Sequence, residues 1–255
     1  MNYYNEHNKH AAAWLRELIK DGQIPPGFVD ERDIQEVKPE QLKKYVQCHF
    51  FAGIGGWPLA LKIAGWPETE KVWTGSCPCQ PFSVGGDGKG FSDVRHLWPV
   101  FAGLIRAGKP STVFGEQVAS SLGRVWLSGV LSDLEGMGFE TGAADLCAAS
   151  VNAPHIRQRI YWLANASGAG LQRRLCAVSD EQRATGQADA RCFYSRFEVV
   201  TGTNGKRRRI EPGLVPLADG LPGRVAALRG YGNAINPILA AEFIGAFMDV
   251  KGGAL

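Results

Sequence analysis

The sequence predicts a mostly parallel α/β sheet, and three observations support this prediction. Short apolar segments alternate along the chain with segments of helical periodicity, which is typical of parallel strands joined by helices. A glycine-rich turn joins one of these strands to the helix after it. The composition is globular, with 45% hydrophobic and 21% charged residues among 255. A chain of this size suffices for one full domain with a small appendage.

The periodicity of the apolar residues places the elements in chain order. Residues 10–20 put apolar side chains on one helical stripe, and the prolines within 24–28 end that helix. Residues 46–56 indicate a strand ending in glycines, and the helix after it begins at Trp57. The pattern recurs more loosely at 71–83, 111–118 and 155–164. Residues 125–138 and 236–248 favour helices.

The composition changes after Ala164, where Asn, Ser, Gly, Gln and Arg dominate and only 192–200 favours a strand. Between Ala166 and Glu211 there are nine Lys or Arg residues and five acids. Clustered cations favour nucleic acid as a partner, although a solvated basic loop would have the same charge. We expect an α/β domain over 1–165, a small basic region over 166–213, and a segment over 214–255 that returns to the domain.

Targeting and redox signals point to the cytoplasm. The longest apolar stretches are too short or too interrupted to span a bilayer, and the first ten residues have no apolar core of a signal peptide. Six cysteines are scattered through a chain that is long enough to bury a core without disulfides. We therefore expect a reduced cysteine set and no membrane partner.

The glycine turn Phe51-Ala52-Gly53-Ile54-Gly55-Gly56 is suited to a cofactor, because glycines let backbone amides approach a ligand at a helix N-terminus. Glycine turns are also common after strands that bind nothing. The third glycine of the dinucleotide fingerprint is missing, which argues against NAD. S-adenosylmethionine (SAM) has no pyrophosphate and tolerates this spacing.

The segment Cys77-Pro78-Cys79-Gln80-Pro81 favours a nucleophile. Prolines on both sides of Cys79 predict a rigid loop that presents one thiolate. Zinc is an alternative, but no second cysteine pair has ligand spacing, and the spaced pair His7 and His10 lies far away in sequence. An inert buried cysteine is the other alternative. We expect no metal site.

These two segments and three others resemble the motifs of the DNA cytosine-5 methyltransferases. The similar segments are HFFAGIGG (49–56), PCQPFS (78–83), EQV (116–118), HIRQR (155–159) and GNAINP (232–237). They occur in family order and cover most of the chain outside 166–211, so the chain is identified as a small member of this family. The resemblance implies a Rossmann-like, SAM-dependent methyltransferase fold with a small target-recognition region at 166–213.

Only 21 residues separate Gly56 from Pro78, although family members carry their ribose and adenine contacts between these motifs. NEHNKHA (5–11) resembles the family segment whose Glu binds the ribose, and ERDIQEV (31–37) the segment whose Asp meets adenine. Both precede the glycine turn here. We therefore expect a transposed order, with the second and third family strands first, then the first, then the fourth. The sheet permits this order if crossovers stay short and right-handed. An ordinary capped helix start at residue 5 is the alternative.

The resemblance assigns a role to each matching residue. Cys79 adds to C6 of cytosine, Glu116 protonates the ring, and Arg157 and Arg159 stabilise charge near them. The base is flipped out of double-stranded DNA. The segment 83–92 is glycine-rich enough to close over it as a mobile lid, and a disordered loop of no catalytic role is the alternative. The implied cofactor site consists of Phe51, Ala52, Gly53, Gly55, Glu6, His7, Asp33, Ile34, Pro78, Asn233 and Ala234. The implied DNA contacts are Gln80, Ser83, Arg173, Arg174, Arg196, Arg207, Arg208 and Arg209.

Three residues depart from the family pattern. Gln117 replaces an Asn, His49 an acid, and His155 a Gln; we expect both histidines to be core or supporting groups. Two rival functions remain open: hydroxymethyl transfer to C5 from methylenetetrahydrofolate, and DNA binding without catalysis. The compact chain favours a monomeric, stand-alone modification enzyme of phage or prophage type.

Overall fold

The computed structural model describes residues 1–78, 97–153, 155–166, 198–201, 207–210 and 234–252. Its main body is a seven-stranded sheet in the order β2-β1-β3-β4-β5-β7-β6. The strands of this sheet are β1 (Asn2–Asn5), β2 (Gly27–Asp30), β3 (Gln47–Phe50), β4 (Val72–Gly75), β5 (Thr112–Val118), β6 (Glu140–Cys147) and β7 (Gln158–Asn165). A separate antiparallel pair consists of β8 (Glu198–Thr201) and β9 (Arg207–Ile210).

The predicted fold class is confirmed. Strands β1 to β5 pair in parallel, and only β7 runs antiparallel, to both β5 and β6. The transposed strand order is also confirmed, because β1 lies between β2 and β3 while β3 lies beside β4. The two strands that come first in the chain therefore extend the sheet on the far side of the strand that carries the glycine turn.

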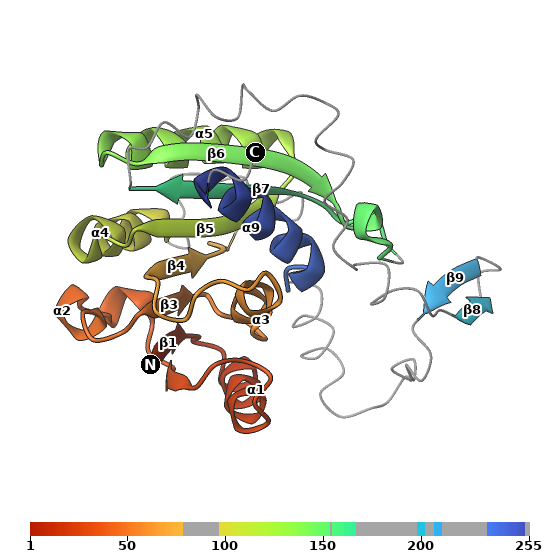
Figure 1. Ribbon diagram of the computed structural model, residues 1–255, viewed down its shortest axis with the longest axis horizontal. Helices are drawn as coiled ribbons and strands as arrows, with labels where there is room; N and C mark the ends of the chain where they lie inside the picture. Colours follow the sequence, from red (N-terminus) through yellow and green to blue (C-terminus); the bar gives the residue numbers. More distant parts are fainter. Residues whose placement is uncertain (79–96, 154, 167–197, 202–206, 211–233, 253–255) are drawn as a thin grey trace.

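Helices cover both faces of this sheet (Figure 1). One face carries α1 (Lys9–Lys20), α3 (Gly56–Ile63) and α9 (Pro237–Gly252), whose buried side chains pack with Tyr4, Val72 and Phe114. The other face carries α2 (Pro39–Leu42), α4 (Trp98–Gly108) and α5 (Ser121–Gly136), which pack around Phe50 and Trp73. Apolar side chains at alternating strand positions thus supply two cores.

The crossover from β3 through α3 to β4 has the opposite hand to its neighbours. Helices α1 and α3 cover the same face, yet β1 leads to β2 in one direction across the sheet and β3 leads to β4 in the other. The crossovers through α2 and α4 cross the sheet in the same direction as the one through α3, but on the opposite face. Compared with the crossover through α1, both the direction and the face are reversed, so the hand is the same. Because parallel crossovers are almost always right-handed, α3 is the exception. The condition that all crossovers stay right-handed is therefore not met at this one place.

Most other elements follow the prediction. The helices expected at 10–20, 125–138 and 236–248 are α1, α5 and α9, and the strands expected at 46–50 and 111–118 are β3 and β5. The strand within 71–83 ends early, at Gly75. Strand β6 and helix α4 were not predicted. The strand expected over 192–200 is β8 from Glu198 on, and its earlier residues lie outside the described ranges. None of the helices in these ranges is long and apolar enough to cross a membrane.

Packing as well as backbone conformation shapes the glycine turn after β3. Gly55 has φ 84° at the N-cap of α3, and a Cβ there would lie 3.1 Å from Leu18 of α1. A Cβ on Gly56 would lie 2.6 Å from Cγ1 of Ile235, in the segment before α9. The two glycines therefore let α1 and this segment close on the turn from different sides.

A Gly55→Ala substitution is expected to lower the free energy of unfolding by about 1–2 kcal/mol, because a left-handed residue would gain a crowded Cβ. Gly129→Ala is the matched control in the middle of α5, where a Cβ would meet no described atom within 4 Å. The control should raise the free energy by up to about 1 kcal/mol. Urea unfolding measures both, and an equal shift in the two variants would contradict this account of the turn.

Candidate active site

The described members of the predicted cofactor site gather at the carboxyl ends of the parallel strands. Glu6 follows β1, Asp33 follows β2, Phe51 follows β3 and Pro78 follows β4. Carboxyl ends of parallel strands share one edge of a sheet, where ligands of doubly wound folds bind. The chain changes direction across the sheet between β1 and β3, so this edge contains the switch point.

Glu6 connects the first strand directly to the glycine turn. Its Oε2 accepts a hydrogen bond of 2.7 Å from the backbone N–H of Gly53, and its Oε1 accepts one of 2.8 Å from that of Asn8. The backbone N–H of Ala52 donates to the carbonyl of Asn5 at 3.0 Å. A carboxylate offers about four acceptor positions, so Glu6 can accept further hydrogen bonds from a ligand.

The alternative for this segment, a capped helix start, also holds. The Asn8 side chain accepts hydrogen bonds from the backbone N–H groups of His10 (3.0 Å) and Ala11 (3.2 Å) and caps α1. His7 is exposed, with Nδ1 3.2 Å from the carbonyl of Glu31. Capping and a place beside the glycine turn are compatible, because the cap uses Asn8 and the turn uses Glu6.

The predicted adenine residues lie in a short turn after β2. Asp33 is half-buried and caps the 3₁₀ helix η1 (Ile34–Glu36), accepting a hydrogen bond of 2.9 Å from Gln35 N–H. Ile34 is buried in the same core as Phe50. Phe51, also half-buried, has φ 51° and packs edge-on against Phe101. The turn after β2 thus places the polar Asp33 directly before the buried Ile34, and Phe51 adds an apolar side chain after β3.

A second group surrounds Glu116 near the end of β5. Glu116 lies opposite Tyr161 in the β5–β7 register, and Arg159 lies diagonally across, opposite Val118. Arg159 Nε is 2.9 Å from Glu116 Oε1. The structure thus brings together two of the predicted catalytic residues, and Arg157 acts on the pKa of the same carboxyl.

Burial raises the pKa of Glu116, and the charges of Arg159 and Arg157 lower it without cancelling the increase. Burial also lowers the pKa of Arg157, and the neighbouring Arg159 acts in the same direction. A buried carboxyl with a raised pKa holds its proton more readily at neutral pH, as a general acid requires.

Residues 234–236, the described part of the GNAINP motif before α9, connect the two groups. The carbonyl of Ala234 accepts a hydrogen bond from Arg157 Nη2, and Ile235 packs against Gly56. The Asn236 side chain then caps α9 by accepting hydrogen bonds from Ile238 (3.0 Å) and Leu239 (3.1 Å). The residues just before α9 therefore contact both Arg157, directly before β7, and the glycine turn.

Sequence reasoning missed Tyr161, which is buried and directly opposite Glu116. Burial raises the pKa of Tyr161, and the Glu116 charge adds to the increase. Its position two residues after Arg159 in a strand was the available signal, because alternate residues share a face.

The departures from the family pattern lie in different surroundings. His49 is fully buried as expected, with Nδ1 2.9 Å from Thr74 Oγ1, and burial lowers its pKa to about 3. His155 is exposed, so of the two expected roles, core or supporting group, the structure rules out the core position for it. Gln117 is buried, and its Oε1 accepts a hydrogen bond of 2.8 Å from Val118 N–H on its own strand.

Several predicted residues lie outside the described ranges. These are Cys79, Gln80, Ser83, Arg173, Arg174, Arg196 and Asn233, together with the rest of the 83–92 segment. Arg207, Arg208 and Arg209 form β9, of which only the backbone is described. Strand β4 leads toward the predicted nucleophile, because Cys77 and Pro78 follow it and Cys77 is buried.

The sheet order and the glycine turn define a doubly wound α/β fold with its candidate site at the carboxyl ends of the strands. The chain belongs to the C-5 cytosine-specific DNA methylase family, whose model matches residues 62–190, half of the chain. The matched range begins after the glycine turn and leaves out both transposed segments. This agrees with the altered order of the strands.

Two curated relatives are type II methyltransferases. M.AplI of Arthrospira platensis is 33% identical over 155 residues, 47% of this chain and 45% of the relative. M.HhaI of Haemophilus parahaemolyticus is 30% identical over 167 residues, 50% of this chain and 51% of the relative. The chain thus matches about half the length of each. The chain is also similar to a solved structure of a DNMT2 mutant of Spodoptera frugiperda. The match covers 66% of this chain and 43% of the DNMT2 chain, with a TM-score of 0.44 and 17% sequence identity.

The Glu116 carboxyl should titrate above the ordinary glutamate pKa of about 4.3 in ¹³C NMR of labelled protein. Arg159→Gln should raise this pKa further, because the Arg159 charge lowers it. Arg124→Gln is the control, since it breaks the exposed Arg124–Asp145 ion pair and should leave Glu116 unchanged. A fall in the Glu116 pKa on loss of Arg159 would contradict the electrostatics described here.

Proposed function

We propose that this chain transfers a methyl group from SAM to C5 of cytosine in DNA, through a covalent adduct between Cys79 and C6. Family membership supports the reaction class. The observation that carries the rest is the hydrogen bond between Glu6 and Gly53, because it joins the transposed ribose segment to the glycine turn.

The residues at the strand ends fit SAM. Among the described residues, a Cβ on Gly53 would meet only the Phe51 carbonyl, at 3.9 Å, which would leave room for a ligand above the turn. Glu6 would accept hydrogen bonds from the ribose, Asp33 would face the adenine amino group, and Phe51 would supply apolar contact. His7, Ile34, Pro78, Asn233 and Ala234 would complete this site. When bound, SAM supplies an electrophilic methyl group.

The chain's own residues would activate the cytosine. The Cys79 thiolate adds to C6 while Glu116 gives its proton to N3, which leaves the electron pair at C5. After C5 has taken up the methyl group, a base removes the C5 proton, the S–C6 bond breaks, and N3 returns its proton to the Glu116 carboxylate, which restores the thiolate, the acid and the aromatic ring. The raised pKa of Glu116 supports its role as the acid. Arg159 would hold the Glu116 carboxyl, and Arg157 would fix the segment before α9.

Double-stranded DNA is the proposed substrate. The target base must leave the helix to reach Cys79, at an unstacking cost on the order of a few kcal/mol. The basic region 166–213 would supply contacts through Arg173, Arg174, Arg196 and Arg207 to Arg209, and Gln80 and Ser83 would lie near the flipped base. Residues 1–165 with 214–255 would form the catalytic part of a cytoplasmic monomer.

Nucleoside mass spectrometry of DNA from a modification-free host that expresses the chain tests this function. We expect 5-methylcytosine with the wild type and with Cys147→Ala, a partly exposed thiol, and none with Cys79→Ala. Hydroxymethylcytosine would overturn SAM as the donor in favour of methylenetetrahydrofolate. Unmodified DNA from folded protein would favour a non-catalytic DNA-binding protein instead.

A further inference from the structure

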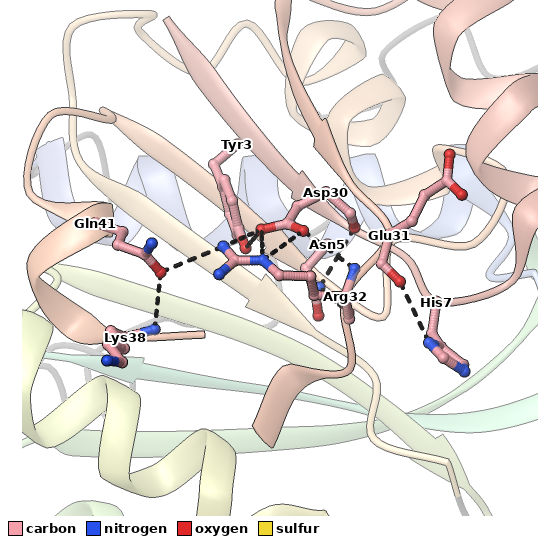
Figure 2. Close-up of polar contacts among 8 residues, drawn as sticks. All are labelled: Tyr3, Asn5, His7, Asp30, Glu31, Arg32, Lys38 and Gln41. Atoms are coloured by element: carbon pink, nitrogen blue, oxygen red, sulfur yellow. Dashed lines mark hydrogen bonds and ion pairs between the residues drawn. The ribbon is translucent and has the colours of Figure 1, made fainter. Parts of the chain in front are cut away.

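A buried carboxylate, Asp30, organises the corner that follows β2 (Figure 2). Asp30 is 4% exposed and accepts hydrogen bonds from both side chain and backbone of Arg32. The shortest joins Arg32 Nη2 to Asp30 Oδ2 at 2.6 Å, and Nε lies 3.0 and 3.1 Å from the two oxygens. The Tyr3 hydroxyl donates to Oδ2 at 2.8 Å. Two side chains and one backbone N–H thus satisfy both oxygens.

The carboxylate is kept ionised despite its burial. Burial alone raises the pKa of Asp30, but the hydrogen bonds from Arg32 and Tyr3 outweigh this and lower it. Arg–carboxylate pairs with several hydrogen bonds are strong and fix geometry. The corner is therefore held by an ion pair in which the carboxylate is buried and the Arg32 side chain is 41% exposed.

The backbone of the same corner is tied to the end of β1. Asn5 Nδ2 donates to the carbonyls of Arg32 (2.8 Å) and Asp30 (3.4 Å), and Glu6 N–H donates to the Asp30 carbonyl at 3.0 Å. Arg32 Nη2 also donates to Gln41 Oε1 at 3.2 Å, which accepts from Lys38 N–H at the start of α2. The corner thus joins β1, β2 and α2.

We propose that Asp30 and Arg32 are positioning residues for the cofactor, which fix the turn that carries Asp33 at a set place relative to Glu6. Asp33 is the residue directly after Arg32, and Glu6 is the residue directly after Asn5. The two carboxylates expected at opposite ends of the adenosine are therefore each one residue away from this hydrogen-bond cluster. The inference rests on the proposed use of SAM.

A neighbouring ion pair on the same turn provides a matched control. Arg16 Nη2 lies 2.6 Å from Glu31 Oε1, but these side chains are 48% and 35% exposed. Exposed pairs contribute little. Removing Arg16 deletes an arginine–carboxylate contact one residue from Asp30 without touching the buried cluster.

The test is the dissociation constant of SAM, measured by isothermal titration calorimetry on full-length protein. Arg32→Ala should raise it about tenfold, and Tyr3→Phe, which removes one hydrogen bond and keeps the buried ring, about threefold. The dissociation constant of Arg32→Lys should lie between those of wild type and Arg32→Ala, because an ammonium keeps the positive charge but cannot make the paired hydrogen bonds of a guanidinium. Arg16→Ala should stay within about twofold of wild type. The methylation rate at saturating SAM should change less than about twofold in every variant.

Three outcomes would overturn the inference. Arg32→Ala and Tyr3→Phe that melt earlier but bind SAM like wild type would show a structural role only. Equal weakening by Arg16→Ala would assign the effect to surface charge. If the wild type binds no SAM, this inference and the proposed function are both overturned. If the wild type binds SAM and the variants bind it with the same dissociation constant, only this inference is overturned. Tyr3→Phe decides the matter if Arg32→Ala does not fold.

Discussion

The hydrogen bond between the Glu6 carboxylate and the Gly53 N–H is the contact on which the proposed site depends. It joins two segments that lie 47 residues apart in the chain and follow neighbouring strands of the sheet. Backbone pairing already brings the end of β1 beside the turn, where Ala52 N–H donates to the Asn5 carbonyl, and this bond adds a side-chain carboxylate to that contact. With it, an acid expected to bind a ribose lies against the backbone expected to cradle the same ligand.

The sheet shows why the order of segments along the chain can change while the site stays in place. Strand order in space fixes which carboxyl ends adjoin, and β1 adjoins β3 whether it precedes or follows β3 in sequence. The consequence of the transposition appears in the connections. Helix α3 must lead from β3 to β4 while it covers the same face as α1, so this crossover has the rarer hand. Glycines at 55 and 56 let α1 and the segment before α9 pack against that unusual connection.

Motifs and periodicity predicted the sheet, the glycine turn, the transposed strands and the neighbouring positions of Glu116 and Arg159. Local sequence carries that information, because a motif identifies the residues of a site and the alternation of apolar residues identifies which face of a strand is buried. Contacts made across the fold were not predicted. Ile235 against Gly56 joins residues far apart in sequence, and Asp30 was not considered at all because its role depends on Tyr3 and Arg32 meeting around it. Strand β6 was missed because its side chains lack clear alternation and none is fully buried. His155 was expected to be a core or supporting group, and its position in a loop exposes it.

The central claim is that the segments ahead of the glycine turn complete the cofactor site. A crystal structure of the chain with S-adenosylhomocysteine tests it most directly. We expect the ribose hydroxyls within hydrogen-bond distance of the Glu6 carboxylate and the adenine amino group beside Asp33, above the turn at Gly53. A ligand bound away from Glu6 and Asp33, with its ribose held by other residues, would contradict it.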